Sequence, residues 1–346
     1  MHSLHDSILA QDNDAVAHSR SETGYGYMRV KRTDVVDVLH KAIKEAGIPV
    51  LFNKRITTIQ ESGSGVIATF ADGTIANADM LFGCDGIHSA VRRLYVDPSQ
   101  KPEYSGLAGL MAIISTANLP QSATQQIRGL TATLTGQGMF LGAPCTASGS
   151  EVFWGFQHEI AIPDANDDRD GWEVQGRYEI EGFKKNLHAV LAGGKGDWCE
   201  VLRQLVDRTE VMKFYPIYRL PLGGSWSRGK VILVGDAAHA MQPHAGQGVG
   251  MALEDVFLIS RLLADPSRPI EEVGDSFHKI RKPRVEEIYQ TASHNAGARK
   301  NTGPWGQWMR EWVIWASFAI PLGMASKSKR VLGQKFTTYD IEEEKV

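Results

Sequence analysis

The chain has 346 residues, of which 42% are hydrophobic and 22% charged, and its formal net charge is −3 at pH 7. This length is enough to bury a large core in one big or two ordinary domains, which excludes a small disulfide-stapled scaffold. The composition is that of a soluble globular protein, and the slight acidic excess gives no reason to expect a nucleic-acid partner.

The cysteines and the N-terminus indicate a cytoplasmic protein. Cys84, Cys145 and Cys199 are widely separated, form no CxxC pair and leave one cysteine over in any disulfide scheme. A reducing, intracellular setting therefore fits better than an oxidising one. The first 19 residues contain early acids and lack an apolar core of signal-peptide length.

The first hundred residues read as one helix followed by short strands. In residues 33–47 the apolar positions fall on one face, which predicts an amphipathic helix with Thr33 or Asp34 as its cap and Gly47 as its stop. Four β-rich runs follow between glycine-containing turns, at residues 48–52, 55–60, 65–70 and 73–84. The last of them is expected to be a buried strand.

The middle of the chain has a different amino-acid composition. Residues 104–160 are rich in Gly, Thr and aromatic residues and predict a separate sheet. Residues 163–171 read as an exposed acidic loop, and two helices are expected at 183–194 and 198–210.

The last third returns to alternating strand and helix. Residues 230–236 predict a buried strand, 249–265 a strong helix, and 278–300 a charged helix interrupted near Pro283. The longest apolar stretch, residues 312–325, is shorter than the roughly 20 residues that span a bilayer. We expect a buried C-terminal helix there, with contact to a membrane surface as the alternative.

The order of elements predicts an α/β fold with a β-rich insertion. The second α/β segment is expected to complete the sheet begun by the first, with the β-rich middle as a cap. The predicted parts are two pieces of an incomplete Rossmann-like domain, a β-rich substrate domain and a C-terminal helical tail, at residues 1–100 and 216–300, 101–215 and 301–346.

Two strands end in an acid beside a glycine, in MLFGCDGIHSAVRR (residues 80–93) and VILVGDAAHAMQPHAGQGVG (residues 231–250). In open α/β sheets, ligands bind in the crevice at the carboxyl ends of the strands. An Asp there accepts hydrogen bonds from sugar or polyol hydroxyls, and the glycines of the second motif lead into a helix whose free amides attract negative charge. Two such strand ends together indicate a ligand site.

Other interpretations of the second motif are weaker. GQGVG has its third glycine one residue early for the GxGxxG dinucleotide pattern, and it lies about ten residues after the strand. His239 and His244 have no third ligand placed with them, so a zinc site is not expected.

The two motifs together resemble those of the FAD-dependent aromatic hydroxylases, the group A flavin monooxygenases, and especially their salicylate-hydroxylase-like branch. The resemblance extends from about residue 28 to about residue 295. It implies that Gly235 and Asp236 bind the ribityl chain or the adjoining diphosphate of FAD, and that Pro243 lies beside the reactive edge of the flavin. It further implies that the isoalloxazine ring contacts a helix start formed by Gly246, Gln247, Gly248 and Val249.

The resemblance assigns the first motif as well. Asp85 and Gly86, completed by Ser89 and Arg92, match the family motif associated with FAD and the nicotinamide donor. Arg32 matches an FAD-contacting arginine of the family, although Val35 stands where the family prefers Leu.

The implied activity is an NAD(P)H-dependent monooxygenase. NAD(P)H would reduce the flavin, molecular oxygen would form a C4a-hydroperoxide, and an aromatic or polycyclic small molecule would be hydroxylated or epoxidised, as in secondary metabolism. The cofactor supplies the difficult chemistry, while the protein positions it and excludes water.

One family feature has no counterpart in the printed residues. The family begins with a strand, a GxGxxG turn, a helix and a second strand, whereas residues 1–31 contain only Gly24 and Gly26. Three explanations stay open: a fragment of a working hydroxylase, a short product that binds flavin weakly or with a partner, and a derived protein without redox chemistry that acts as an isomerase, cyclase or binding module.

Residues that would select the substrate are harder to predict. Phe140, Phe153, Trp154 and Phe156 are candidates for the wall of an aromatic pocket. His158 and Arg219 could assist deprotonation, but each has a structural role as its simpler explanation. No catalytic base is assigned.

Overall fold

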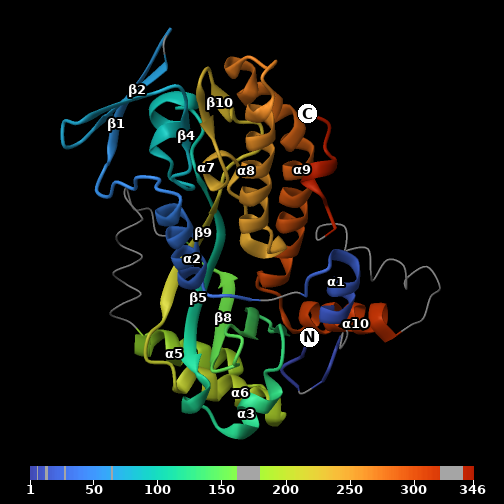
Figure 1. The fold of residues 1–346 in the computed structure, drawn as a ribbon. Helices are drawn as coiled ribbons and strands as arrows, with labels where there is room; N and C mark the ends of the chain where they lie inside the picture. The colour runs from blue at the N-terminus through green and yellow to red at the C-terminus, as the bar shows by residue number, and fades with distance from the viewer. Residues whose placement is uncertain (6, 12–14, 27–28, 64, 162–179, 320–337) are drawn as a thin grey trace. The chain divides into compact units, whose positions relative to one another are not determined.

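The computed structural model describes residues 1–346 except 6, 12–14, 27–28, 64, 162–179 and 320–337. Helices alternate with parallel and antiparallel strands, as the α/β prediction requires (Figure 1). The chain forms two compact units. Unit 1 comprises Met1–Ile48, Gly106–Ile217 and Gly297–Thr338, and unit 2 comprises Pro49–Ser105, Tyr218–Ala296 and Tyr339–Val346. The predicted boundaries instead placed residues 1–100 together, and they stay a prediction.

The β-rich middle forms a five-stranded sheet in the order β6-β7-β8-β5-β9. Its strands are β5 (Glu103–Ser115), β6 (Thr131–Leu134), β7 (Gly138–Pro144), β8 (Glu151–Glu159) and β9 (Lys213–Arg219). The long β5 pairs antiparallel with β8 from Leu107↔Glu159 to Ser115↔Glu151. The Gly-, Thr- and aromatic-rich texture of this region therefore does correspond to a sheet of its own.

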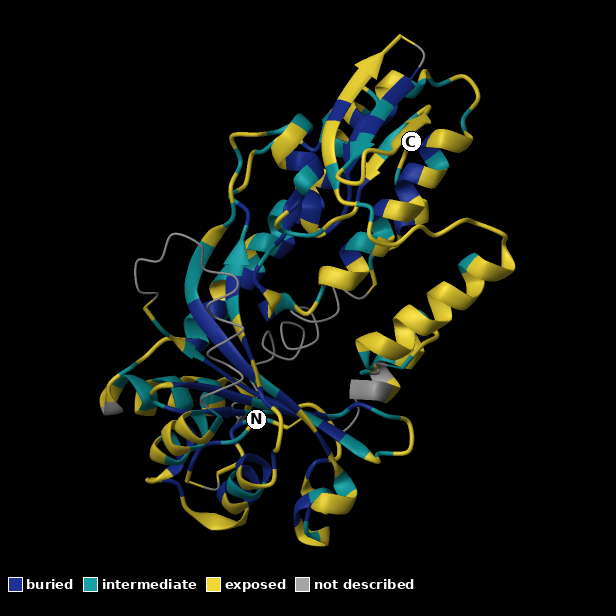
Figure 2. Ribbon diagram, turned by 90° about the vertical axis from the view of Figure 1, so that its left-hand side faces the viewer, coloured by how far each residue is buried: buried dark blue, intermediate teal, exposed yellow. Residues whose placement is uncertain are grey.

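One face of this sheet carries the main core of unit 1. Alternate residues of a strand point to the same face, so Val152, Trp154 and Phe156 of β8 all join this core. The core includes side chains of α3 (Gln121–Gln126), α5 (Ile180–Leu191) and α6 (Gly196–Asp207). The indole of Trp154 is fully enclosed and donates to Thr209 Oγ1 at 2.9 Å. Buried strands of this sheet are dark blue in Figure 2.

The N-terminal helices are α1 (Ala15–Thr23) and α2 (Arg32–Glu45). Helix α2 was predicted, but its N-cap is Lys31, with no capping side chain, rather than Thr33 or Asp34. Gly47 follows the helix with φ 68°, the left-handed conformation expected of a glycine stop. No residue of α2 is buried, so its predicted apolar face is open to solvent (Figure 2).

Unit 2 contains two three-stranded sheets. A meander joins β1 (Ile56–Ser62), β2 (Gly65–Phe70) and β3 (Ile75–Ala78), and the other sheet has the order β10-β11-β4. In that sheet β11 (Val231–Leu233) runs parallel to β4 (Leu81–Gly83) and antiparallel to β10 (Ser227–Arg228). The predicted strand at residues 48–52 does not form, and its side chains are exposed.

Within the described residues β4 is an edge strand, because β11 is its one neighbour in the sheet order. Its Phe82 is 40% exposed.

The helices of unit 2 are α7 (Asp236–His239), α8 (Gly248–Ala264) and α9 (Val273–Ala296). Helices α8 and α9 lie side by side (Figure 1). The predicted interruption near Pro283 is wrong, since α9 is continuous through it. Pro283 and Lys279, whose carbonyl loses its helical partner, are both exposed, so solvent can satisfy that carbonyl.

Short helical turns complete the described chain. They are η1 (Arg92–Val96), η2 (Thr116–Asn118), η3 (Pro243–Ala245), η4 (Ile270–Glu272), η5 (Gly297–Arg299) and η6 (Ile341–Glu343). Cys84, Cys145 and Cys199 are free, without a disulfide. The predicted acidic loop at 163–171 lies outside the described residues.

The C-terminal helix differs from its prediction. Helix α10 (Pro304–Ala319) includes the first part of the apolar stretch, but Trp312 and Val313 are each 54% exposed rather than buried. Residues 320–325 of that stretch lie outside the described residues. Among the described helices, none has the length and apolar character needed to cross a membrane.

Leu187 of α5 tests the core of unit 1. Its side chain is 1% exposed within the cluster on the sheet, so Leu187→Ala should lower the free energy of unfolding by about 2–5 kcal/mol. Leu130→Ala, at a position 56% exposed, should change it by less than about 0.5 kcal/mol. Urea denaturation of both variants measures the difference, and equal effects would contradict this core.

Candidate functional site

The two acid-glycine motifs meet at one edge of a sheet in unit 2. Leu233, the last residue of β11, pairs with Gly83, the last residue of β4, and the strands are parallel. Their carboxyl ends therefore open on the same side, as the sequence predicts. We call the segments that follow, residues 84–91 and 234–247, the strand-end loops.

Arg92 ties the two strand-end loops together. Its side chain is 2% exposed, and it donates from Nη1 to the carbonyl of Ala237 at 2.7 Å and from Nη2 to the carbonyl of Ile87. Burial lowers the pKa of the guanidinium. Ser89 Oγ, also buried, accepts from the backbone amide of Arg92 at 2.9 Å. The polar groups of Ser89 and Arg92 are thus directed into the protein, where they hold the loops in place.

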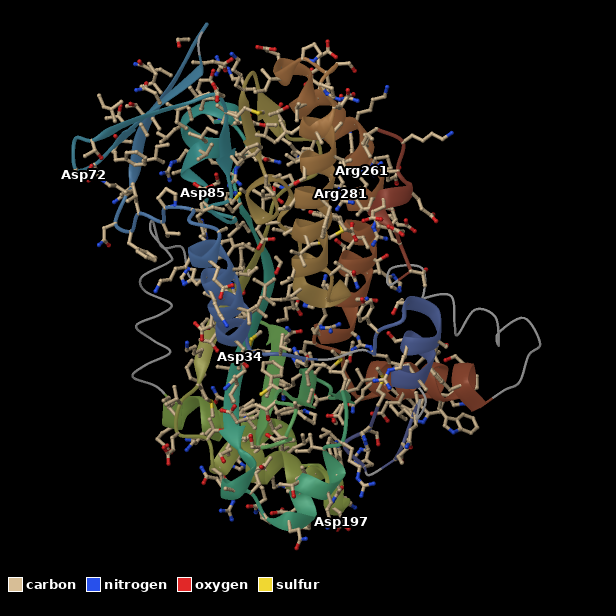
Figure 3. The ribbon with its side chains drawn as sticks, viewed as in Figure 1. Asp34, Asp72, Asp85, Asp197, Arg261 and Arg281 are labelled. Carbon is tan, nitrogen blue, oxygen red and sulfur yellow. The ribbon has the colours of Figure 1, made fainter. Side chains whose placement is uncertain are left out.

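Asp85 shapes the first loop. Its Oδ2 accepts from the amides of Ala90 at 2.7 Å and Val91 at 3.2 Å, while the residue as a whole is exposed (Figure 3). The next residue, Gly86, has φ 77°, and the position of an added Cβ is open space. The loop therefore presents bare backbone beside a carboxylate.

Gly235 shapes the second loop. It has φ 59°, which L side chains rarely adopt, and an added Cβ would lie 3.1 Å from Ala252 Cβ of α8. This turn releases the chain from the buried strand and places Asp236 as the first residue of α7. The side chain of Asp236 is exposed at the strand end.

A buried charge cluster holds the second loop from behind. Asp255 of α8 has 0% exposure and accepts from the Gly235 amide at 2.9 Å, from His239 Nε2 at 2.7 Å and from Arg281 Nε at 2.9 Å. Arg281 also pairs with Glu254 at 2.7 Å. Burial by itself would raise the pKa of Asp255, but His239, Arg281 and the Gly235 amide outweigh it and lower that pKa.

The start of α8 is a bare helix N-terminus. Its N-cap residue, Gln247, makes no capping hydrogen bond through its side chain. Nothing lies within 4 Å of the positions that a Cβ would take at Gly246 and Gly248, and Val249 is 68% exposed. Pro243 opens η3 just before this helix and is exposed as well. A flat group with partial negative charge can therefore approach these amides.

Comparison with known proteins shows which family the chain belongs to. A family model described as FAD binding domain matches residues 5–174 and 222–292, which together are more than half of the chain. The chain belongs to this family.

Two similar proteins are named as a hydroxylase and a monooxygenase of aromatic rings. Salicylate hydroxylase of Pseudomonas putida is 28% identical over 288 residues, covering 78% of this chain and 62% of that protein. 6-Hydroxynicotinate 3-monooxygenase of Pseudomonas fluorescens is 26% identical over 285 residues, covering 82% and 69%. The chain thus spans less than two thirds of the length of the first of these relatives.

Solved structures share the fold. HpxO of Klebsiella pneumoniae, complexed with FAD and uric acid, matches with a TM-score of 0.66 and 20% identity, covering 94% of this chain and 72% of that one. At this identity the likeness concerns the fold alone.

The strand-end loops fit the cofactor of the FAD-binding domain family. Gly86, Gly246 and Gly248 leave backbone open to a planar ring, and the α8 amides suit the negative charge of a reduced flavin. Buried Gln242 Oε1 has no hydrogen-bond partner among the described residues, which leaves an acceptor in this loop for a ligand.

Not every candidate residue belongs to the unit that holds the strand-end loops. Arg32 is the first residue of α2 and belongs to unit 1, whereas the strand-end loops belong to unit 2. His158 also lies in unit 1, where its ring stacks on Phe156 and burial lowers its pKa. Arg219 lies in unit 2 and pairs with Glu103 at 3.8 Å.

The proposed aromatic wall is largely a core. Phe140, Trp154 and Phe156 are each 1–2% exposed and pack in the cluster on the helix-covered face of the sheet. The prediction that these three residues line a pocket is wrong. Alternate residues of β8 share one face, and the face that carries Trp154 and Phe156 is covered by helices. Phe153 points to the other face, where Arg29 stacks on its ring at 4.1 Å.

The sequence analysis did not predict the buried ion pair of Asp255 and Arg281. The two acids within the apolar run VGMALEDVFLIS were a usable signal, because a charge on the buried side of a helix requires a partner. The partner of Asp255, Arg281, is 26 residues away on α9, and no local spacing predicts that pairing.

Gly235→Ala tests the left-handed turn. The added methyl group meets Ala252 and forces a strained φ, so the free energy of unfolding should fall by about 1–3 kcal/mol. Gly248→Ala is the matched control, since it adds a methyl in open space at a helix start and should cost less than about 0.5 kcal/mol. Urea denaturation of the two proteins without flavin decides, and similar losses would contradict the strain.

Asp255→Asn tests the buried cluster. At pH 7 it leaves Arg281 buried with its charge less compensated, so the free energy of unfolding should fall by about 3–5 kcal/mol. Because the folded pKa of Asp255 lies below its ordinary 3.8, the stabilisation is fully present above that value and is lost as pH falls through the folded pKa.

The gap between wild type and Asp255→Asn should therefore shrink below about pH 4. Asp275→Asn, at an exposed acid of α9, provides the control. A gap that stays constant from pH 7 to pH 3 in urea titrations would refute the ionised cluster.

Proposed function

We propose that the chain acts as an FAD- and NAD(P)H-dependent monooxygenase that hydroxylates or epoxidises a small aromatic or polycyclic molecule. The observation that carries this proposal is the joining of two strand-end loops beside the bare N-terminus of α8. The family membership identifies FAD as the ligand, and the names of the relatives favour an aromatic ring hydroxylase.

In this proposal Asp236 binds the polyol chain or diphosphate end of FAD. Its carboxylate is exposed at the end of a buried strand, so ribityl hydroxyls can reach it and donate hydrogen bonds to it. Asp255 acts behind it as a positioning residue, because it fixes Gly235 and His239 on either side of Asp236.

The ring end of FAD is assigned to the segment from Pro243 to Val249. The exposed Pro243 can lie beside the reactive edge, and the amides of Gly248 and Val249 can hold the negative charge that develops near the C2 carbonyl. When bound, FAD supplies the transfer of electrons from NAD(P)H and the activation of oxygen. The chain's own residues bind, orient and shield it.

Residues of the first loop have two roles in this proposal. Asp85 and Gly86 offer a carboxylate and open backbone to FAD or the nicotinamide donor, while Ser89 and Arg92 support them from within. Arg32, whose role follows from the family resemblance, is the remaining candidate for a contact with FAD.

The substrate is assigned to the sheet face of unit 1 that α5 and α6 do not cover. That face carries Phe153, Met111 and Ile113, of which Ile113 is 49% exposed. The apolar side chains of this face suit an aromatic ring, and Arg29 stacks on Phe153 there. No general base is assigned to it.

Purified protein tests the reaction class. It should be yellow, or become yellow with added FAD, and it should consume NAD(P)H and oxygen together when given an aromatic substrate such as salicylate. Protein that folds cooperatively but cannot be loaded with FAD would overturn the proposal in favour of a derived isomerase, cyclase or binding module.

Asp236→Ala should weaken FAD binding. Loss of a hydrogen bond to a charged group corresponds to about a ten- to hundredfold rise in the Kd for FAD, measured by quenching of flavin fluorescence. Asp275→Ala removes an equally exposed acid of unit 2 and should leave the Kd unchanged. Equal Kd values for both variants would remove Asp236 from the cofactor site.

A further inference from the structure

The polar and apolar sides of helix α10 are placed opposite to those of an ordinary surface helix. The residues turned toward unit 1 are largely polar, and Arg310 donates to the carbonyls of Ala298 at 3.1 Å and Gly297 at 3.3 Å. One apolar residue of this side, Ile314, packs against the small cluster of Leu9, Leu134 and Met139. A surface helix normally buries its apolar stripe and exposes its polar one.

The side turned away from unit 1 is aromatic. Trp305, Trp308, Trp312 and Trp315 follow one another at intervals of three, four and three residues, which places them on one stripe of the helix. They are 83%, 62%, 54% and 49% exposed, and Met309 and Val313 flank them with 58% and 54%. We call these six residues the tryptophan stripe.

Such a stripe marks an interaction surface. Contiguous exposed apolar patches on soluble proteins are sites for a partner protein or a membrane. The choice of residue favours a membrane, because tryptophan combines a large apolar ring with an N–H donor and concentrates at the boundary between lipid headgroups and acyl chains.

The charge of the following sequence favours the same occupant. From Trp312 to Tyr339 the sequence contains four basic residues, Lys327, Lys329, Arg330 and Lys335, and no acidic residue. Basic residues that follow an apolar helix in the sequence can attract anionic lipid headgroups.

We propose that α10 docks this chain on an anionic lipid surface, with the tryptophan stripe lying in the headgroup region parallel to the membrane. Among the described helices none is long and apolar enough to span the bilayer, and the contact that we propose is peripheral. This docking is independent of the reaction proposed above.

Sedimentation with lipid vesicles tests the docking. Wild-type protein should sediment with vesicles of phosphatidylcholine and phosphatidylserine, and more weakly with phosphatidylcholine alone. The double variant Trp308→Ser/Trp312→Ser should lower the partition coefficient by at least about tenfold, since each indole buries as much apolar surface as a core side chain. Val211→Ser, at a position 65% exposed in unit 1, is the matched control and should bind like wild type.

A second variant separates the charge contribution. Replacing Lys327, Lys329 and Arg330 by Gln should reduce binding to the anionic vesicles by about fivefold per residue, with little change for neutral vesicles. Circular dichroism melts should show that both multiple variants stay folded.

Two outcomes would overturn the proposal. The first is wild-type protein that stays in the supernatant with either vesicle. The second is a dimer in sedimentation velocity without lipid that Trp308→Ser/Trp312→Ser disperses, which would assign the tryptophan stripe to a second copy of the chain.

Discussion

The carboxylate of Asp255 is the interaction on which the candidate site depends. A charge with no exposure to water persists only where other groups replace its hydration, and here a backbone amide, a histidine and an arginine do so. The same three bonds join the turn after β11 with helices α7, α8 and α9. The exposed Asp236 has a defined position because the residues on both sides of it are bonded to this buried group.

Much of the fold could be predicted, because its elements follow local rules. The period of the apolar residues found α2 and α8, β-rich runs located β1, β2 and β11, and the acid-glycine pairs located the strand-end loops. The parallel pairing of β4 with β11 then brought those loops together as expected. Each of these inferences rests on residues that are neighbours in sequence or on a rule about strand ends.

The wrong predictions concern the surroundings of a helix or strand rather than its type of secondary structure. The pattern of α2 gives a helix, but which of its faces meets the protein depends on distant segments, and the structure leaves its apolar residues exposed. The aromatic residues of β8 were predicted to form one pocket wall. Successive side chains of a strand point to opposite faces, so Trp154 and Phe153 lie on different sides of the sheet. Pro283 is tolerated in α9 because its side of the helix faces solvent, which the sequence does not state. The pairing of Asp255 with Arg281 depends on two helices lying side by side.

The edge strand β4 has a consequence for how the purified protein behaves. Within the described residues it has one strand neighbour, and its Phe82 is 40% exposed. An edge with apolar neighbours can pair with the same strand of another molecule, and nothing in its three residues, Leu81, Phe82 and Gly83, carries a charge to oppose this. Association through this edge is second order in protein, whereas folding is first order. Dilution therefore favours recovery of the monomer during refolding, and concentration favours the aggregate.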